Sequence, residues 1–262
     1  MGLIEGIILG VVQGLTEFLP ISSSGHLVLA GKILGSRAST GLIFEVMVHF
    51  ATMVAVLIYF RGKIGKMILS LLPPYTSEKM PLLKLAGIIV LGTIPAVIFG
   101  LVFEDKIESA FGSSKMASLM LLVTGLVLLS TKLIKPGQKP LDFKSGFLVG
   151  IAQAAALLPG ISRSGSTISA GMHLKIDPAE AAEFSFLLSL PAVFGATLLK
   201  SFDLFSSPIA SGAIGIYIAG SLTAFAVGYL SIIWLMRIIR QGRFFYFGVY
   251  CLAVGVFSLV LL

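Results

Sequence analysis

Apolar residues fill several stretches of this chain that are each close to the length of a membrane-spanning helix. The stretches lie between clusters of charged residues and glycines, and they lack the strict alternation of apolar and polar positions found in barrel strands. A helix needs roughly 20 predominantly apolar residues to cross the hydrocarbon core of a bilayer. The pattern therefore predicts spanning helices at Ile43–Phe60, Leu85–Phe103, Lys115–Leu133, Ala182–Leu199, Ala213–Met236 and Phe245–Leu262.

Composition supports a membrane protein and excludes an ordinary soluble domain. Hydrophobic residues make up 56% of the 262 residues, charged residues only 12%, and the mean hydropathy is +1.02. A soluble fold could not cover that much apolar surface, so we expect one all-α polytopic membrane domain over residues 1–262, surrounded by membrane lipids. The net charge of +7 does not indicate a nucleic-acid partner, because the basic residues lie in short loops between predicted spans.

Two polar, glycine-rich stretches repeat each other at an offset of 140 residues. Ten positions are identical without a gap, and the first copy holds them at Gly6, Gly10, Gln13, Ile21, Ser22, Ser24, Gly25, Ala30, Gly31 and Leu34. The similarity continues in Phe44 and Phe184 at the same offset, and in Gly92, Ala96 and Gly100 against Gly220, Ala224 and Gly228 at an offset of 128. We predict two repeats, at about 1–134 and 141–262, each a re-entrant helical hairpin followed by three spans. An odd number of crossings in each repeat makes the two halves inverted.

The loops between the predicted spans alternate in charge. One set is rich in lysine and arginine and should be cytoplasmic, whereas the other set has no basic excess and should face outward. With this orientation both chain termini lie outside. The basic loops hold Arg61, Lys63, Lys66, Lys79 and Lys84, then Lys132, Lys135, Lys139 and Lys144, and finally Arg237, Arg240 and Arg243.

The two repeats differ where chemistry would be placed. Glu17, Ser23 and His26 in the first copy correspond to Leu157, Arg163 and Ser166 in the second. Non-helical backbone survives at membrane depth only when it is buried in protein or lines a wet cavity. We therefore expect the two hairpin tips to meet and to combine complementary halves of one site.

The residues at the tips are typical of a site for phosphate and a divalent cation. Arginine binds phosphate oxygens through its planar fork of donors, and hydroxyls and glycine-flanked amides at a helix N-terminus add further donors. Mg²⁺ and Ca²⁺ prefer carboxylate, amide and water oxygens, which Glu17 and Gln13 would supply from one helix face. Ser23 is the candidate nucleophile, and His26 lies three residues later, within reach for proton transfer. The candidate phosphate ligands are Arg163 with Ser22, Ser24, Gly25, Ser162, Ser164, Ser166 and Thr167.

The two motifs QGLTEFLPISSSGH and PGISRSGST resemble the signatures of the bacterial undecaprenyl-pyrophosphate phosphatases, the BacA/UppP family. The resemblance extends over essentially the whole chain. It implies a hydrolase that acts on a phosphoric anhydride and converts the C55 isoprenyl diphosphate to the monophosphate carrier of peptidoglycan synthesis. It also implies a location in the bacterial plasma (inner) membrane, with the active site open to the outer side. Gln13 and Glu17 match the family's acidic motif, Ser22, Ser23 and His26 its first catalytic loop, and Arg163 its phosphate-binding arginine.

Several other interpretations of these residues stay open at this point. Inverted repeats with broken helices are also typical of transporters, so a lipid-phosphate flippase or an anion carrier is the alternative function. Glu17, His26 and Arg163 could form a buried polar network that only fixes the hairpins, and Glu45 with His49 could form a structural hydrogen bond or a proton relay. A pair of glycines such as Gly6 and Gly10 could pack within the chain or across a homodimer.

Overall fold

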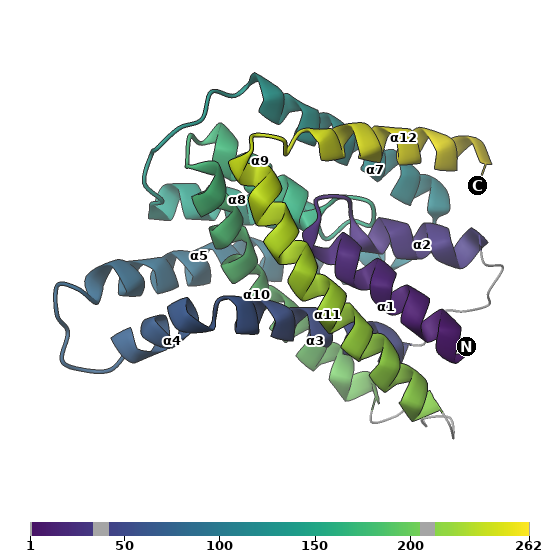
Figure 1. Ribbon diagram of the computed structural model, residues 1–262, viewed down its shortest axis with the longest axis horizontal. Helices are drawn as coiled ribbons and strands as arrows, with labels where there is room; N and C mark the ends of the chain where they lie inside the picture. Colours follow the sequence, from purple (N-terminus) through teal and green to yellow (C-terminus); the bar gives the residue numbers. More distant parts are fainter. Residues whose placement is uncertain (1, 34–41, 205–212, 262) are drawn as a thin grey trace.

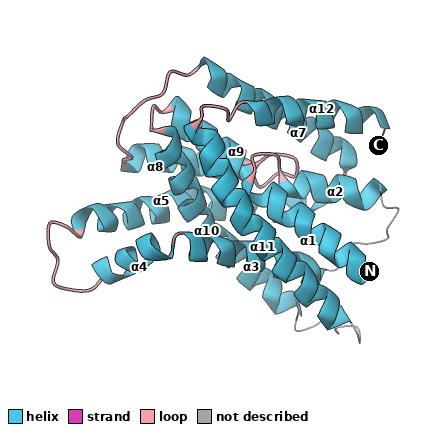
Figure 2. Ribbon diagram, viewed as in Figure 1, coloured by secondary structure: helices cyan, strands magenta, loops and turns pink. Residues whose placement is uncertain are grey.

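The computed structural model describes residues 2–33, 42–204 and 213–261, and within these ranges it contains helices and no strand (Figures 1 and 2). The all-α fold class predicted from the sequence is thereby confirmed. Leu34, the last residue of the first repeat signature, and Leu262, the end of the last predicted span, lie outside the described residues. The helices are α1 Leu3–Phe18, α2 Ser23–Ile33, α3 Leu42–Tyr59, α4 Arg61–Ser70, α5 Met80–Val102, α6 Glu104–Phe111, α7 Ser114–Ser130, the 3₁₀ helix η1 Thr131–Leu133, α8 Phe143–Ala155, α9 Arg163–His173, α10 Pro178–Leu204, α11 Ala213–Arg240 and α12 Tyr246–Leu261.

Four helices of the described chain are long and apolar enough to cross a membrane, and they coincide with four of the predicted spans. They cover Met80–Val102, Ser114–Leu133, Pro178–Lys200 and Ile214–Arg240. A fifth predicted span is α3, which continues into α4 after a bend of 77°, and the sixth is the shorter apolar helix α12. The arrangement of three spans per repeat and the inverted orientation stay predictions.

Two stretches that were expected to be loops are helical. The basic residues Arg61, Lys63 and Lys66 lie on α4, and the acidic stretch after α5 forms α6. Both helices are short and largely exposed, and α6 carries its acidic residues in its first turn, where they favour the positive end of the helix dipole. Their polarity concealed them, because the expected spans were identified by continuous apolar runs.

Helices of the two repeats pack across each other in a reciprocal way. Helix α1 lies against α11, and its repeat counterpart α8 lies against α5 (Figure 1). A Cβ atom added to Gly10 would overlap the carbonyl oxygen of Gly220, and one added to Gly150 would overlap that of Gly92. These are equivalent contacts, since Gly10 corresponds to Gly150 and Gly92 to Gly220. The glycines permit close approach of helix backbones within one chain, as is usual for small residues in membrane helices.

The close contact at Gly10 makes a stability prediction. We expect Gly10→Ala to lower the free energy of unfolding by about 1–3 kcal/mol, because the added methyl group meets rigid backbone of α11 rather than a flexible side chain. Gly62→Ala is the matched control, since a Cβ on this helical glycine of α4 meets open space and alanine is the better helix former. The midpoint of thermal unfolding in detergent measures both. A Gly10 variant as stable as the wild type would contradict the close packing.

Termini and basic segments lie on opposite sides of the molecule. Helix α1 begins and α12 ends at the right of Figure 1, whereas the loop that joins α4 to α5 lies at the far left. The segment before α8 is fixed by Asp142, whose carboxylate accepts hydrogen bonds of 2.7 Å from both the hydroxyl and the amide of Ser145. These hydrogen bonds, that from the hydroxyl above all, lower the pKa of Asp142 below its ordinary value. The separation of the two chain ends from the basic loop between α4 and α5 agrees with the charge pattern of the loops. The membrane orientation stays a prediction.

Candidate active site

The turns at the tips of the two helical hairpins lie against each other in the structure. A Cβ on Gly25, in the first turn of α2, would come within 3.0 Å of the Cα of Gly160, which precedes α9. Thr124 of α7 fixes the second turn, because its hydroxyl donates to the Gly160 carbonyl at 2.9 Å and accepts from the Ser162 amide at 3.0 Å. Gly160 has a φ of +95°, a conformation that glycine adopts without strain. The expected meeting of the two tips is present.

Each tip uses its serines in the same way. The hydroxyl of Ser22 accepts from the Gly25 amide at 3.2 Å, and that of Ser162 accepts from the Gly165 amide at 3.1 Å. Each hydroxyl also lies 3.3 Å from the hydroxyl two residues later, in Ser24 and in Ser164. Ser22 and Ser162 thus occupy one of the amides at the start of α2 and of α9 that have no acceptor within the helix.

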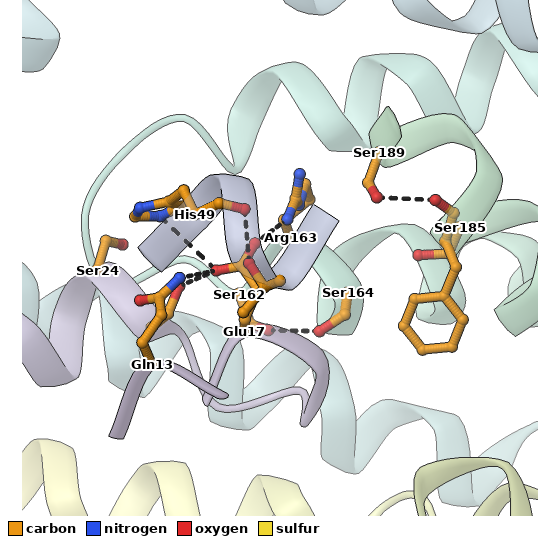
Figure 3. Close-up of polar contacts among 12 residues, drawn as sticks. Gln13, Glu17, Ser24, His49, Ser162, Arg163, Ser164, Ser185 and Ser189 are labelled. Carbon is orange, nitrogen blue, oxygen red and sulfur yellow. Dashed lines mark hydrogen bonds and ion pairs between the residues drawn. The ribbon is translucent and has the colours of Figure 1, made fainter. Parts of the chain in front are cut away.

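Glu17 is the centre of a polar cluster whose members lie on α1, α2, α3 and α9. Figure 3 shows Gln13, His49 and Arg163 around it. Its carboxylate is buried and forms an ion pair with Arg163 of α9 through Oε1. The other oxygen, Oε2, accepts from the Ser23 hydroxyl at 2.6 Å and from Gln13 Nε2 at 3.1 Å, and His49 Nε2 of α3 lies 3.8 Å from it. The structure therefore brings together the predicted residues Gln13, Glu17, Ser23 and Arg163.

Arg163 and His49 are the more exposed members of the cluster. The side chains of Arg163 and His49 are 23% and 33% exposed, whereas that of Glu17 is 6% exposed. An acid taken out of water is costly unless it is paired, and Arg163 supplies the compensating charge here. An anion arriving from outside the cluster would meet the guanidinium before it met the carboxylate.

His26, the expected partner of Ser23, is directed to other groups. Its Nδ1 lies 2.8 Å from the Ser22 carbonyl oxygen, and its Nε2 lies 2.9 Å from the hydroxyl of Tyr250 on α12. The residue that receives the hydrogen bond of Ser23 is Glu17. The acid–base role expected for His26 stays a prediction.

The remaining candidate phosphate ligands lie on the first turns of α9. Ser164 Oγ is buried and lies 3.4 Å from the Leu19 carbonyl oxygen, and Ser166 is half-buried. The hydroxyl of Thr167 donates to the Arg163 carbonyl at 2.7 Å and lies 2.5 Å from the hydroxyl of Ser185 on α10. These contacts are internal to the protein, and the assignment of these residues to phosphate stays a prediction.

Two residues of the site, His49 and Tyr250, are not among the site residues predicted from the sequence. His49 was considered chiefly with Glu45, and its Nδ1 does lie 2.8 Å from the Glu45 carbonyl oxygen, but its Nε2 faces Glu17. Tyr250 lies in an apolar stretch and gave no signal. A histidine in a predicted span is a functional candidate on its own, and this was the signal available for His49.

Glu17 and Gln13 are the predicted ligands of a divalent cation, and in the structure the amide nitrogen of Gln13 faces the Glu17 carboxylate. Gln13 is fully buried, and its Oε1 has no hydrogen-bond partner in the structure. The described residues contain no group of three or more histidine, cysteine or acidic side chains that could hold a metal ion. Mg²⁺ commonly binds one or two protein carboxylates together with water and substrate phosphates, and Glu17 and Gln13 would offer it one carboxylate and one amide oxygen. The divalent cation stays a prediction.

Comparison with known proteins identifies relatives over nearly the full length. The sequence model of a family described as "Bacitracin resistance protein BacA" matches residues 6–257, a range that includes every residue of the cluster and Tyr250. An undecaprenyl-diphosphatase of Desulfosudis oleivorans is 44% identical over 265 residues, which is 96% of each chain. Those of Syntrophotalea carbinolica and Korarchaeum cryptofilum are 42% and 41% identical, covering 97% and 100% of both chains respectively.

Proposed function

The chain belongs to the BacA family, and we propose that it is an integral membrane undecaprenyl-diphosphatase. It hydrolyses the anhydride bond between the two phosphates of a C55 isoprenyl diphosphate. In the net reaction one water molecule is consumed, the bond between the terminal phosphorus and the bridging oxygen breaks, and inorganic phosphate and the lipid monophosphate are released. The monophosphate is the carrier on which peptidoglycan precursors are built.

The observation that carries this proposal is the convergence of Ser23, Glu17 and Arg163 from separate helices. A hydroxyl, a carboxylate that accepts its hydrogen bond at 2.6 Å, and an arginine beside that carboxylate can supply the nucleophile, the base and the phosphate ligand of phosphoryl transfer. Helices α2 and α9 begin at Ser23 and Arg163, so that their N-terminal amides also favour an anion at the tips.

We propose that Ser23 attacks the terminal phosphorus. Its proton passes to Oε2 of Glu17 while the new bond between Oγ and phosphorus forms, and the lipid monophosphate leaves with the bridging oxygen. Water then attacks the phosphoserine, and Glu17 returns the proton to the Ser23 oxygen as its bond to phosphorus breaks. This restores the hydroxyl and the carboxylate and releases inorganic phosphate. In this scheme Arg163 exchanges its partner from Glu17 to the phosphate oxygens, whose negative charge it stabilises.

A second scheme uses the same residues with water as the direct nucleophile. The water would donate to Oε2 of Glu17 in place of the Ser23 hydroxyl. Ser23 would then hydrogen-bond to this water and orient it. In either scheme Gln13 and Glu17 would hold a divalent cation, Mg²⁺ or Ca²⁺, which would offset the charge of the diphosphate.

We also propose that the site opens to the outer side of the plasma membrane, with both chain termini on that side. The charge pattern supports this orientation, because the basic segments lie away from the start of α1 and the end of α12. The pair Gly6 and Gly10 packs on Ile216 and Gly220 of α11 within the same chain. A homodimer, if one forms, would use another surface.

The test is phosphate release from a C55 isoprenyl diphosphate by the purified protein in detergent, with and without EDTA. We expect release that EDTA abolishes and that added Mg²⁺ or Ca²⁺ restores. Ser23→Ala then separates the two nucleophiles: a fall in kcat of about 10³-fold or more indicates attack by serine, and a fall of about tenfold indicates water.

The runner-up function predicts a different result in the same assay. A flippase or an anion carrier would bind the lipid diphosphate and move it between leaflets without releasing phosphate. Binding without release by a folded wild-type protein would therefore replace the hydrolase with a transporter. Release that persists in EDTA would remove the divalent cation from the proposal.

A further inference from the structure

Helix α12 reaches the first hairpin turn through two adjacent residues. The Tyr250 hydroxyl lies 2.9 Å from Nε2 of His26, and the two rings stack with centroids 5.7 Å apart and planes inclined by 9°. Next to it, the fully buried Cys251 directs its sulfur to the Pro20 carbonyl oxygen at 3.6 Å. The last helix of the second repeat thus contacts the turn just before and just after the serines of the first repeat.

The hydrogen bonds of His26 determine which nitrogen carries its proton. The Ser22 carbonyl oxygen can only accept, so Nδ1 at 2.8 Å must be the donor. In a neutral imidazole Nε2 is then an acceptor, and the Tyr250 hydroxyl donates to it. Tyr250 and Ser22 together select one tautomer and one ring orientation.

The orientation of His26 bears on Ser23 through a single peptide group. The Ser22 carbonyl oxygen accepts two hydrogen bonds from His26, one from its backbone amide at 3.1 Å and one from its ring at 2.8 Å. This carbonyl and the Ser23 amide belong to the same planar unit, so the ring bond reinforces the backbone bond in setting the direction of the Ser23 amide. Ser22 has a φ of +68°, a left-handed conformation that is unfavourable for a residue other than glycine and that surrounding contacts must maintain. The Ser23 amide belongs to the first turn of α2, where amides lack an acceptor within the helix.

We propose that Tyr250 is a positioning residue for phosphoryl transfer. Acting through His26, it holds the peptide between Ser22 and Ser23 so that the amide of Ser23 faces the terminal phosphoryl group and the hydroxyl stays on Glu17. This inference rests on the proposed function. The role given to His26 follows from the two contacts that it makes in the structure. The proposal also assigns a function to a half-exposed tyrosine in an otherwise apolar helix.

The direct test is Tyr250→Phe, which keeps the stacked ring and removes the hydroxyl. We expect kcat for phosphate release to fall about tenfold while KM changes by less than about twofold, because alignment of the reacting groups is lost and lipid binding is not. Tyr246→Phe is the matched control on the same helix, where the ring stacks on Phe245 away from the turn, and it should leave kcat unchanged. A Tyr250→Phe variant with wild-type kcat would overturn the proposal.

A double-mutant cycle with His26→Ala shows whether Tyr250 acts through His26. If it does, Tyr250→Phe has no further effect on kcat once His26 is absent. A full additional tenfold loss in that background would mean an independent role and would overturn the proposal. A substrate with a radiolabelled terminal phosphate allows low rates of phosphate release to be measured. Melting temperatures in detergent show whether each variant is folded. Failure of the wild type to release phosphate would instead refute the proposed hydrolase.

Discussion

Glu17→Gln is expected to lower kcat for phosphate release by about 10³-fold, within the range that general bases contribute. Glutamine keeps the shape and can still accept a hydrogen bond, but it cannot take the proton of Ser23 and no longer balances Arg163. Because the guanidinium is partly exposed, we expect a cost of about 1–2 kcal/mol in folding free energy rather than the larger cost of a fully buried unpaired charge.

A second ion pair supplies the control for this variant. Lys63 of α4 pairs with Glu183 of α10, and both side chains are partly exposed. Glu183→Gln also breaks an ion pair between distant parts of the chain, so it should lower stability slightly and leave kcat within about twofold, as expected of a partly exposed pair. Measurement of kcat and of the melting temperature for both variants separates chemistry from stability. Wild-type kcat in Glu17→Gln would exclude the carboxylate from the mechanism.

The fold was largely predictable because the membrane restricts what a long apolar run can become. The run expected to span Leu85–Phe103 lies within α5 but for its last residue, and that expected at Lys115–Leu133 ends with η1. Helices α4 and α6 were missed because they are short and carry charged residues, so a search for long apolar runs does not find them. The bend of 77° between α3 and α4 could not be predicted either, because hydropathy indicates the length of an apolar run and not its direction.

The centre of the site was predictable for an energetic reason. Ionisable residues at membrane depth must be paired or used, and Glu17 and Arg163, both predicted on this ground, form an ion pair in the structure. The partners of His26 could not be found in this way. Its contact with Tyr250 joins residues 224 positions apart, and nothing in the local sequence of either residue indicates the other. The N-cap bonds of Ser22 and Ser162 were likewise hidden, because a serine that caps a helix and one that binds phosphate occur in the same sequence context.

Arg163→Lys should lower kcat/KM by about 10²-fold or more although the positive charge remains. Lysine can still pair with Glu17, so the protein should keep its melting temperature. What is lost is the planar fork that binds two phosphate oxygens at once and stabilises charge in the transition state. Phosphate release and thermal unfolding, measured on the same preparation, test both halves of this expectation. Equal kcat/KM in the two proteins would mean that Arg163 contributes charge alone.

The variant Glu17→Gln/Arg163→Gln separates a catalytic pair from a structural one. If the two residues only joined the hairpins, removing both charges would leave no unpaired group, and stability and activity would recover together. For a catalytic pair we expect the double variant to regain stability relative to Glu17→Gln while kcat stays at or below that of the single variant, because neither the base nor the phosphate ligand has been restored. Recovery of kcat in the double variant would reduce Glu17 and Arg163 to a structural network.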